Sequence, residues 1–104
     1  AAAGVDLDSL DSLGAAYDAA VLAGSEDTDV LAERFGLGVG EYLARHGGMM
    51  WQVITDMYGS DLGLVARRGD RTVIPTNLVA ARLMMAETGW LPRAVAHLAS
   101  VSQG

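Results

Sequence analysis

Three glycines in five residues, Gly36, Gly38 and Gly40, lie in the stretch RFGLGVGEYL, and glycine-rich loops can cradle phosphate. A phosphate loop places its glycines directly after a strand, at the start of a helix, with G-x-G-x-x-G spacing or a following lysine. Here the spacing is G-x-G-x-G, helical periodicity continues on both sides, and the chain contains no lysine. The helical surroundings, the glycine spacing and the lack of a lysine therefore all argue against a phosphate loop.

Glycines inside a helix need another explanation, because each costs about 1 kcal/mol of helix stability relative to alanine. Gly36 and Gly40 are four residues apart, so they share one face of the predicted helix, beside its apolar sector. Missing side chains there would let another helix or the sheet approach closely. We favour this structural role over the alternative, a hinge or kink in the helix.

Arg67, Arg68 and Arg71 place three of the seven basic residues around one predicted hairpin tip. Arginine binds carboxylate and phosphate groups through paired hydrogen bonds, so these residues are candidates for binding an anionic ligand or an acidic partner. Two alternatives stay open. The charges could prevent edge-to-edge pairing of sheets, or they could pair with the acidic first helix of the same or a neighbouring molecule.

The remaining polar residues form no pattern typical of a catalytic or metal site. The histidines, His46 and His97, are far apart in the sequence, and there is no cysteine. His46 falls within the apolar sector of its helix, so we expect a partly buried structural histidine. Asp56 and Asp61 flank a predicted turn that lacks the dense oxygen ligands of a calcium loop. With no nucleophile–base pair identifiable, we expect no catalytic residue, no metal, no cofactor and no enzymatic activity.

Acidic residues dominate the first third of the chain. Residues 1–33 hold eight acids and no base, and the net charge of the whole chain is −6. Asp6, Asp8 and Asp11 are predicted to lie on a solvated helix face, too exposed to have shifted pKa values. A net acidic domain repels a phosphate backbone, so we expect no nucleic-acid partner.

Periodicity predicts the elements that would position these residues. Apolar residues three and four apart indicate a helix over about 7–23 and a second helix that starts at Asp27 or Thr28 and ends before Gly47. A period of two then predicts three strands, over about 51–58, 62–67 and 72–74. We expect a turn at Gly59-Ser60-Asp61 between the first two strands and a hairpin turn at Gly69-Asp70 between the second and third. Pro75 is expected to end the third strand.

Two more helices are expected after the strands. Thr76 or Asn77 would cap the third helix, and Gly89 would end it, with Trp90 folding back on Met85. Pro92 would be the first residue of the fourth. The expected fold is α+β, in the order α-α-β-β-β-α-α, with a three-stranded antiparallel meander covered on one face by helices. Residues 1–104 are expected to form a single domain, with residues 1–5 either disordered or derived from a tag.

Four local motifs follow one another along the chain: Gly36-x-x-x-Gly40-Glu41-x-Leu43, Gly48-x-x-Trp51, Asp56-x-Tyr58-Gly59, and a hairpin ending in Pro75. As a set they resemble a family of small bacterial α+β domains of unknown function. The resemblance covers about residues 35–80 and departs from the family in the extra Gly38 and in Met49-Met50 before the tryptophan. It implies a fold and a bacterial origin, but no activity and no catalytic residue. The residues to which we assign structural roles are Gly36, Gly40, Trp51, Gly59, Pro75 and Gly89.

Composition bears on origin and compartment. All seven basic residues are arginine and alanine is abundant, which suggests a GC-rich bacterial genome such as that of an actinobacterium. No apolar run approaches the roughly 18 residues that a membrane span needs. We expect a cytoplasmic protein, although a native N-terminal signal would not be visible in a sequence that starts without methionine.

High apolarity points to a contact surface. Apolar residues make up 51% of this short chain, so some apolar surface is expected to stay exposed, and of Met84 and Met85 at least one should face solvent. The leading hypothesis is a non-enzymatic domain that acts through protein–protein interaction or self-association, as a homodimer. The alternative is a domain that binds a small anionic ligand through Arg67, Arg68 or Arg71.

Overall fold

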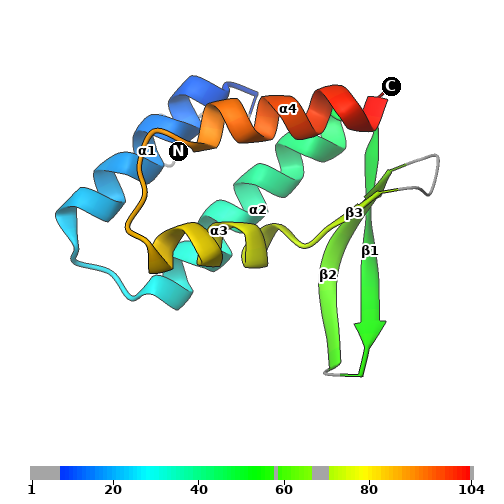
Figure 1. The fold of residues 1–104 in the computed structure, drawn as a ribbon, viewed down its shortest axis with the longest axis horizontal. Coiled ribbons are helices and arrows are strands. Elements are labelled where there is room, and N and C mark those ends of the chain that lie inside the picture. Colours follow the sequence, from blue (N-terminus) through cyan, green and yellow to red (C-terminus); the bar gives the residue numbers. More distant parts are fainter. Residues whose placement is uncertain (1–7, 58, 67–70, 104) are drawn as a thin grey trace.

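The computed structural model describes residues 8–57, 59–66 and 71–103. They form seven elements in the predicted order, which confirms the α+β class (Figure 1). The elements are α1 (Leu10–Ala23), α2 (Thr28–His46), β1 (Met49–Asp56), β2 (Gly59–Ala66), β3 (Thr72–Val73), α3 (Pro75–Met84) and α4 (Leu91–Gln103). The expectations for residues 1–5 and for the turn at Gly69-Asp70 fall outside the described residues.

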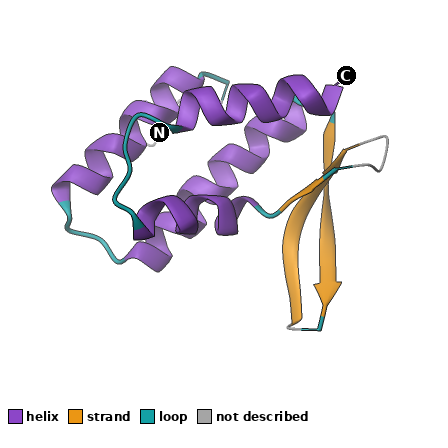
Figure 2. Cartoon of the chain, viewed as in Figure 1, coloured by secondary structure: helices purple, strands orange, loops and turns teal. Residues whose placement is uncertain are grey.

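The helices form a layer beside an antiparallel meander with strand order β1-β2-β3. α1 packs against α4, and α2 packs against α3 and reaches both long strands. The core lies between the helices and the near half of the sheet, where Leu43, Met49 and Leu64 are fully buried. Figure 2 shows the end of the β1–β2 hairpin extending away from the helices.

The first two helices begin at side-chain caps. Ser9 accepts a hydrogen bond from the Ser12 N–H at 3.2 Å, so α1 starts three residues later than the predicted residue 7. Asp27 accepts from the Asp29 N–H at 2.9 Å and caps α2, one of the two predicted starts. Gly24 ends α1 in the left-handed region, with φ of 64°.

The predicted turn at Gly59-Ser60-Asp61 is wrong. These three residues belong to β2, and the pairing register sets Gly59 opposite Asp56 and Asp61 opposite Ile54. Gly59 has φ of 130°, which glycine adopts without a steric penalty, so β2 begins directly after the chain reverses. Both long strands are therefore eight residues long, and β1 begins at Met49, two residues before the predicted start.

The predicted cap of the third helix is also wrong. Pro75 is the first residue of α3, and Ile74, which has no capping side chain, precedes it in place of a Thr76 or Asn77 cap. Proline suits this position because its φ is already helical and it has no N–H that would need a partner. The Ile74 carbonyl accepts from the N–H groups of Asn77 and Leu78, so the backbone itself supplies the first turn.

The end of α3 differs from the prediction as well. The helix stops at Met84, and Gly89, with φ of 76°, lies further along the connection to α4 instead of at the helix end. Ala86 takes a left-handed conformation instead, with φ of 50°. Met84 and Met85 are both exposed, at 89% and 74%, in agreement with the prediction that at least one would be.

Trp90 does not fold back on Met85. Its buried ring stands edge-on to Tyr17 of α1, with the ring centroids 5.3 Å apart at 84°. Tyr17 makes the same edge-on contact with Phe35 of α2, again at 5.3 Å. This aromatic stack joins α1, α2 and the start of α4, which begins at Leu91, one residue before the predicted start.

Candidate functional site

The glycines of α2 face neighbouring elements at short range. A Cβ atom at Gly36 would lie 2.9 Å from both the N and the Cα of Thr76, at the start of α3. A Cβ atom at Gly40 would overlap the indole ring of Trp51, in β1. Both glycines are buried by these contacts, so no space is left beside them for a phosphate.

Gly38, the middle one of the three glycines, faces a third element. A Cβ atom there would lie 2.9 Å from Cδ1 of Leu13, in α1. The neighbour in this case is the end of a flexible side chain, whereas at Gly36 it is backbone. Through its three glycines, α2 is the central element against which α3, β1 and α1 pack.

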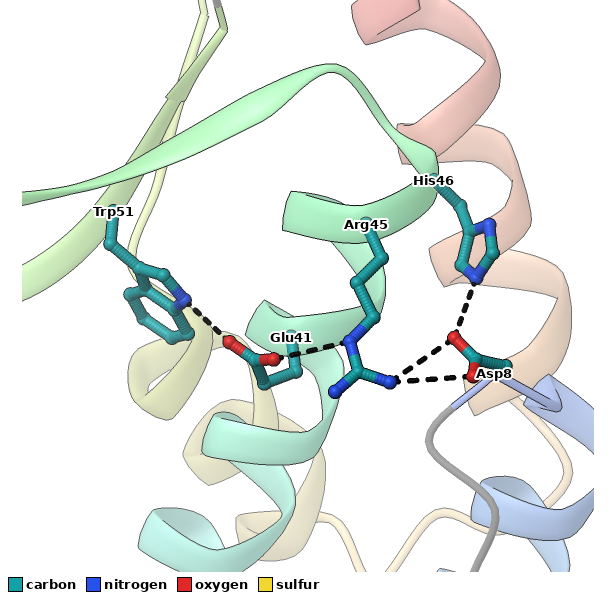
Figure 3. Close-up of polar contacts among 5 residues, drawn as sticks. All are labelled: Asp8, Glu41, Arg45, His46 and Trp51. Atoms are coloured by element: carbon teal, nitrogen blue, oxygen red, sulfur yellow. Dashed lines mark hydrogen bonds and ion pairs between the residues drawn. The ribbon is translucent and has the colours of Figure 1, made fainter.

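A chain of polar contacts runs across the last two turns of α2 (Figure 3). Trp51 Nε1 donates to Glu41 Oε1 at 2.9 Å, and Arg45 Nε lies 3.3 Å from Glu41 Oε2. Arg45 also donates to both carboxylate oxygens of Asp8 at 3.3 Å, and His46 Nε2 lies 2.9 Å from Asp8 Oδ1. The contacts tie β1 and the segment before α1 to the end of α2.

The position of these polar contacts favours the positive charge of Arg45 and the negative charge of Asp8. Arg45 and His46 lie in the last turn of α2, where the helix dipole stabilises positive charge. Hydrogen bonds from His46 and then from Arg45 hold the pKa of the Asp8 carboxyl below its ordinary value. The prediction that Asp8 is too exposed for a shifted pKa is therefore wrong, because partners can shift the pKa of a solvated group.

His46 lies nearer the surface than predicted. Its side chain is 42% exposed, and its ring lies obliquely against Tyr42 with centroids 4.7 Å apart. His97 is exposed on α4, far along the chain from His46. Within residues 8–57, 59–66 and 71–103, no three His, Asp or Glu side chains lie close enough together to hold a metal ion.

Of the three arginines predicted to bind a ligand or partner, the structure describes one. Arg67 and Arg68 lie outside the described residues. Arg71 is exposed just before β3, and its carbonyl accepts from the Ala66 N–H at 2.8 Å. An anion-binding role for this group stays a prediction.

Sequence reasoning missed one feature of the sheet, the outer edge of β1. The order β1-β2-β3 leaves β1 paired on one side only within the described residues. The Ala66 N–H points at β3, so by strand alternation Val65, Gly63 and Asp61 direct their backbone groups at β1. Their partners on β1 are the even-numbered residues. The odd-numbered residues of β1, from Met49 to Thr55, therefore direct their N–H and C=O groups outward.

The same hairpin exposes apolar side chains outside the core. Val53 and Leu62 lie opposite each other in the register, on the side that faces the helices nearer the core, and they are 68% and 48% exposed. Met50 is exposed on the other side of the sheet. From Met49 to Thr55 the strand carries no charge and no proline, which are two of the devices that protect a sheet edge. That absence of charge was the signal in the sequence.

Within the described part of the chain, no helix combines the length and apolarity required to cross a membrane.

Comparisons with other proteins agree with the predicted resemblance. Neither curated proteins nor solved structures gave a match. The sequence model of DUF3806, a domain of unknown function, matches residues 9–92, which extends the resemblance seen over residues 35–80 to the first helix and to the start of the fourth. The chain therefore belongs to the DUF3806 family.

Proposed function

We propose that this domain is a non-enzymatic self-association module and that two copies pair through the outer edges of their β1 strands. The observation that carries the proposal is the outer edge of β1, which no strand pairs within the described residues. Backbone groups of Met49, Trp51, Val53 and Thr55 are directed outward there, along the uncharged segment Met49–Thr55. Unpaired strand edges of this kind add a strand from another chain. Antiparallel pairing of two β1 strands would give one continuous six-stranded sheet.

The strand is complementary to itself, which favours a second copy as the partner. In an antiparallel pairing centred on Gln52, Trp51 of one copy lies opposite Val53 of the other, and Met50 lies opposite Ile54. Apolar residues thus meet apolar residues on both faces of the sheet. The exposed Val53 would gain cover from the half-buried Trp51 of the second copy.

Charge restricts where two copies can meet. Each copy carries a net charge of −6, so most surfaces of two copies repel each other. β1 from Met49 to Thr55 is an uncharged segment on this acidic molecule. Pairing at this edge keeps like charges out of the contact.

The edge can be tested with one substitution that changes only the outward backbone donor. Proline at position 53 removes an N–H that β2 does not use, and proline is tolerated on edge strands when its missing donor faces solvent. Val53→Pro should therefore fold yet be monomeric by light scattering coupled to size exclusion, while the wild-type chain is dimeric. The matched control, Val53→Thr, keeps the N–H and the branched shape and should remain dimeric.

Two outcomes would overturn the proposal: a wild-type chain that is monomeric at every concentration, or a Val53→Pro chain that is still dimeric. If Val53→Pro fails to fold, as judged by far-UV circular dichroism, Val53→Lys replaces it. This substitution keeps the backbone intact and places a charge on the edge, which opposes pairing.

A further inference from the structure

A pocket is lined by residues from the end of α3, the start of α4 and the connection between them. Figure 1 shows these segments at the end of the helical layer away from the sheet. The volume of the pocket is about 670 Å³, within the range of roughly 300–1,000 Å³ that small-molecule sites occupy. Arg82, Arg93 and His97 line it, together with Glu87, Thr88 and Trp90. Two arginines against one carboxylate give the lining a formal charge of +1 on a chain with a net charge of −6. The Asp18 carboxylate also accepts a hydrogen bond from the N–H of Gly89, another lining residue, at 3.0 Å.

Arg82 is held in place before any ligand arrives. Its Nη1 donates to Glu87 Oε2 at 2.8 Å, and the guanidinium lies over the Trp90 ring, 5.1 Å from the centroid. Trp90 in turn is fixed against Tyr17 of α1. A guanidinium has five N–H donors, so the contact with Glu87 leaves other donors for a ligand.

Arg93 and His97 line the other side of the pocket. They are four residues apart on α4, so they project from one face of the helix. Both are exposed, and among the described residues neither has a hydrogen-bond or ion-pair partner. Arg93 also lies in the first turn of α4, where the helix dipole favours an anion.

We propose that this pocket binds the phosphate group of a small phosphorylated molecule, between the fixed guanidinium of Arg82 and the free guanidinium of Arg93. Arginine binds phosphate through paired, charge-assisted hydrogen bonds, and two arginines suit its double charge. The pocket volume leaves room for an organic group attached to the phosphate. The site is separate from the proposed β1 interface and does not depend on it.

Amide NMR spectra of the folded chain, titrated with three probes, test the proposal. Inorganic phosphate and phenyl phosphate should shift the amides of residues 87–97, and phenyl phosphate should bind more tightly because it also fills the pocket. Benzoate, the carboxylate counterpart, should bind more weakly than phenyl phosphate. Arg93→Ala should weaken phenyl phosphate binding roughly ten- to a hundredfold, the usual effect of losing hydrogen bonds to a charged group.

Arg34→Ala is the matched control, because it removes one exposed arginine, on α2, that does not line the pocket. It should leave the affinity for phenyl phosphate unchanged. The proposal is overturned by any of three results: no shifts up to about 10 mM phenyl phosphate, equal affinity for benzoate, or a loss of affinity with Arg34→Ala as large as that with Arg93→Ala. The last result would show that the loss reflects the more negative net charge of the variant and not a contact in the pocket.

Discussion

The indole ring of Trp51 occupies the space where a side chain at Gly40 would be, and its Nε1 donates to Glu41, the next residue of α2, at 2.9 Å. Two adjacent helix residues thus hold one strand residue by different means. The glycine allows the ring to lie against the helix backbone, and the carboxylate pairs with the indole N–H, which would otherwise be partly buried without a partner. This contact fixes where β1 leaves the helical layer, and therefore where its free edge lies.

Substituting the glycines of α2 with alanine should separate their roles. Alanine raises helix propensity by about 1 kcal/mol, but overpacking against rigid neighbours costs about 1–3 kcal/mol. Gly36→Ala meets the Thr76 backbone and Gly40→Ala meets the Trp51 ring, so both should lower the free energy of unfolding. Gly38→Ala meets only the flexible end of Leu13 and should be close to neutral.

Urea denaturation of the three variants measures this order. Gly38→Ala is the internal control, since it makes the same chemical change in the same helix. If Gly36→Ala and Gly40→Ala were as stable as Gly38→Ala, the close packing around these two glycines would not be what requires them.

The contact between Glu41 and Trp51 should be measurable by itself. Glu41→Ala leaves the indole N–H without its acceptor and should lower the free energy of unfolding by about 1 kcal/mol. Glu41→Gln keeps an acceptor oxygen and loses only the exposed ion pair with Arg45, so its loss should be smaller.

A double-mutant cycle isolates the contact. Combining Glu41→Ala with Trp51→Phe should cost less than the sum of the two single substitutions, because each alone already breaks the same hydrogen bond. Strict additivity of the unfolding free energies would show that this hydrogen bond does not stabilise the fold.

Some of this arrangement could be predicted from sequence, because residues four apart in a helix lie on the same face of it. The spacing of Gly36 and Gly40 predicts a shared face with a close neighbour, but it cannot say which element approaches. In the structure the two neighbours differ, Thr76 for one glycine and Trp51 for the other. The missing detail is tertiary, since both neighbours come from elements later in the chain.

Other parts could not be predicted for local physical reasons. The start of α3 follows from Pro75 and the Ile74 carbonyl, a backbone arrangement that a search for capping hydroxyl and carboxyl side chains does not detect. The pairing of Asp8 with His46 joins residues 38 apart, and no local pattern encodes it. The outward edge of β1 depends on strand order, which periodicity does not provide.

Acid should weaken the fold partly through Asp8. Its pKa is lowered in the folded protein, so the ionised carboxylate stabilises the native state at pH values above its ordinary pKa of about 3.9. As the pH falls through the lower, folded-state pKa, this stabilisation is lost. Asp8→Asn should therefore show a smaller fall in stability than the wild-type chain below about pH 4.

Thermal melts of both proteins across this pH range measure the effect, at low and at high salt. Asp11→Asn is a suitable control, because Asp11 is a nearby exposed carboxylate on α1. Parallel pH profiles for the wild-type and Asp8→Asn chains would contradict the assigned role of the contacts with His46 and Arg45.

The register of the proposed dimer can be tested by cross-linking, because the chain has no cysteine of its own. In a pairing centred on Gln52, the two Gln52 residues lie opposite each other at a non-hydrogen-bonded position, where Cα atoms are about 4.5 Å apart. That distance suits a disulfide. Gln52→Cys should therefore form a covalent dimer under mild oxidation, visible on a non-reducing gel.

Thr55→Cys is the control. Residue 55 is also exposed, but it lies opposite Met49 in this register, so its two copies are too far apart to link. Cross-linking of Thr55→Cys but not of Gln52→Cys would contradict the register, and cross-linking of neither would contradict the pairing of β1 strands itself.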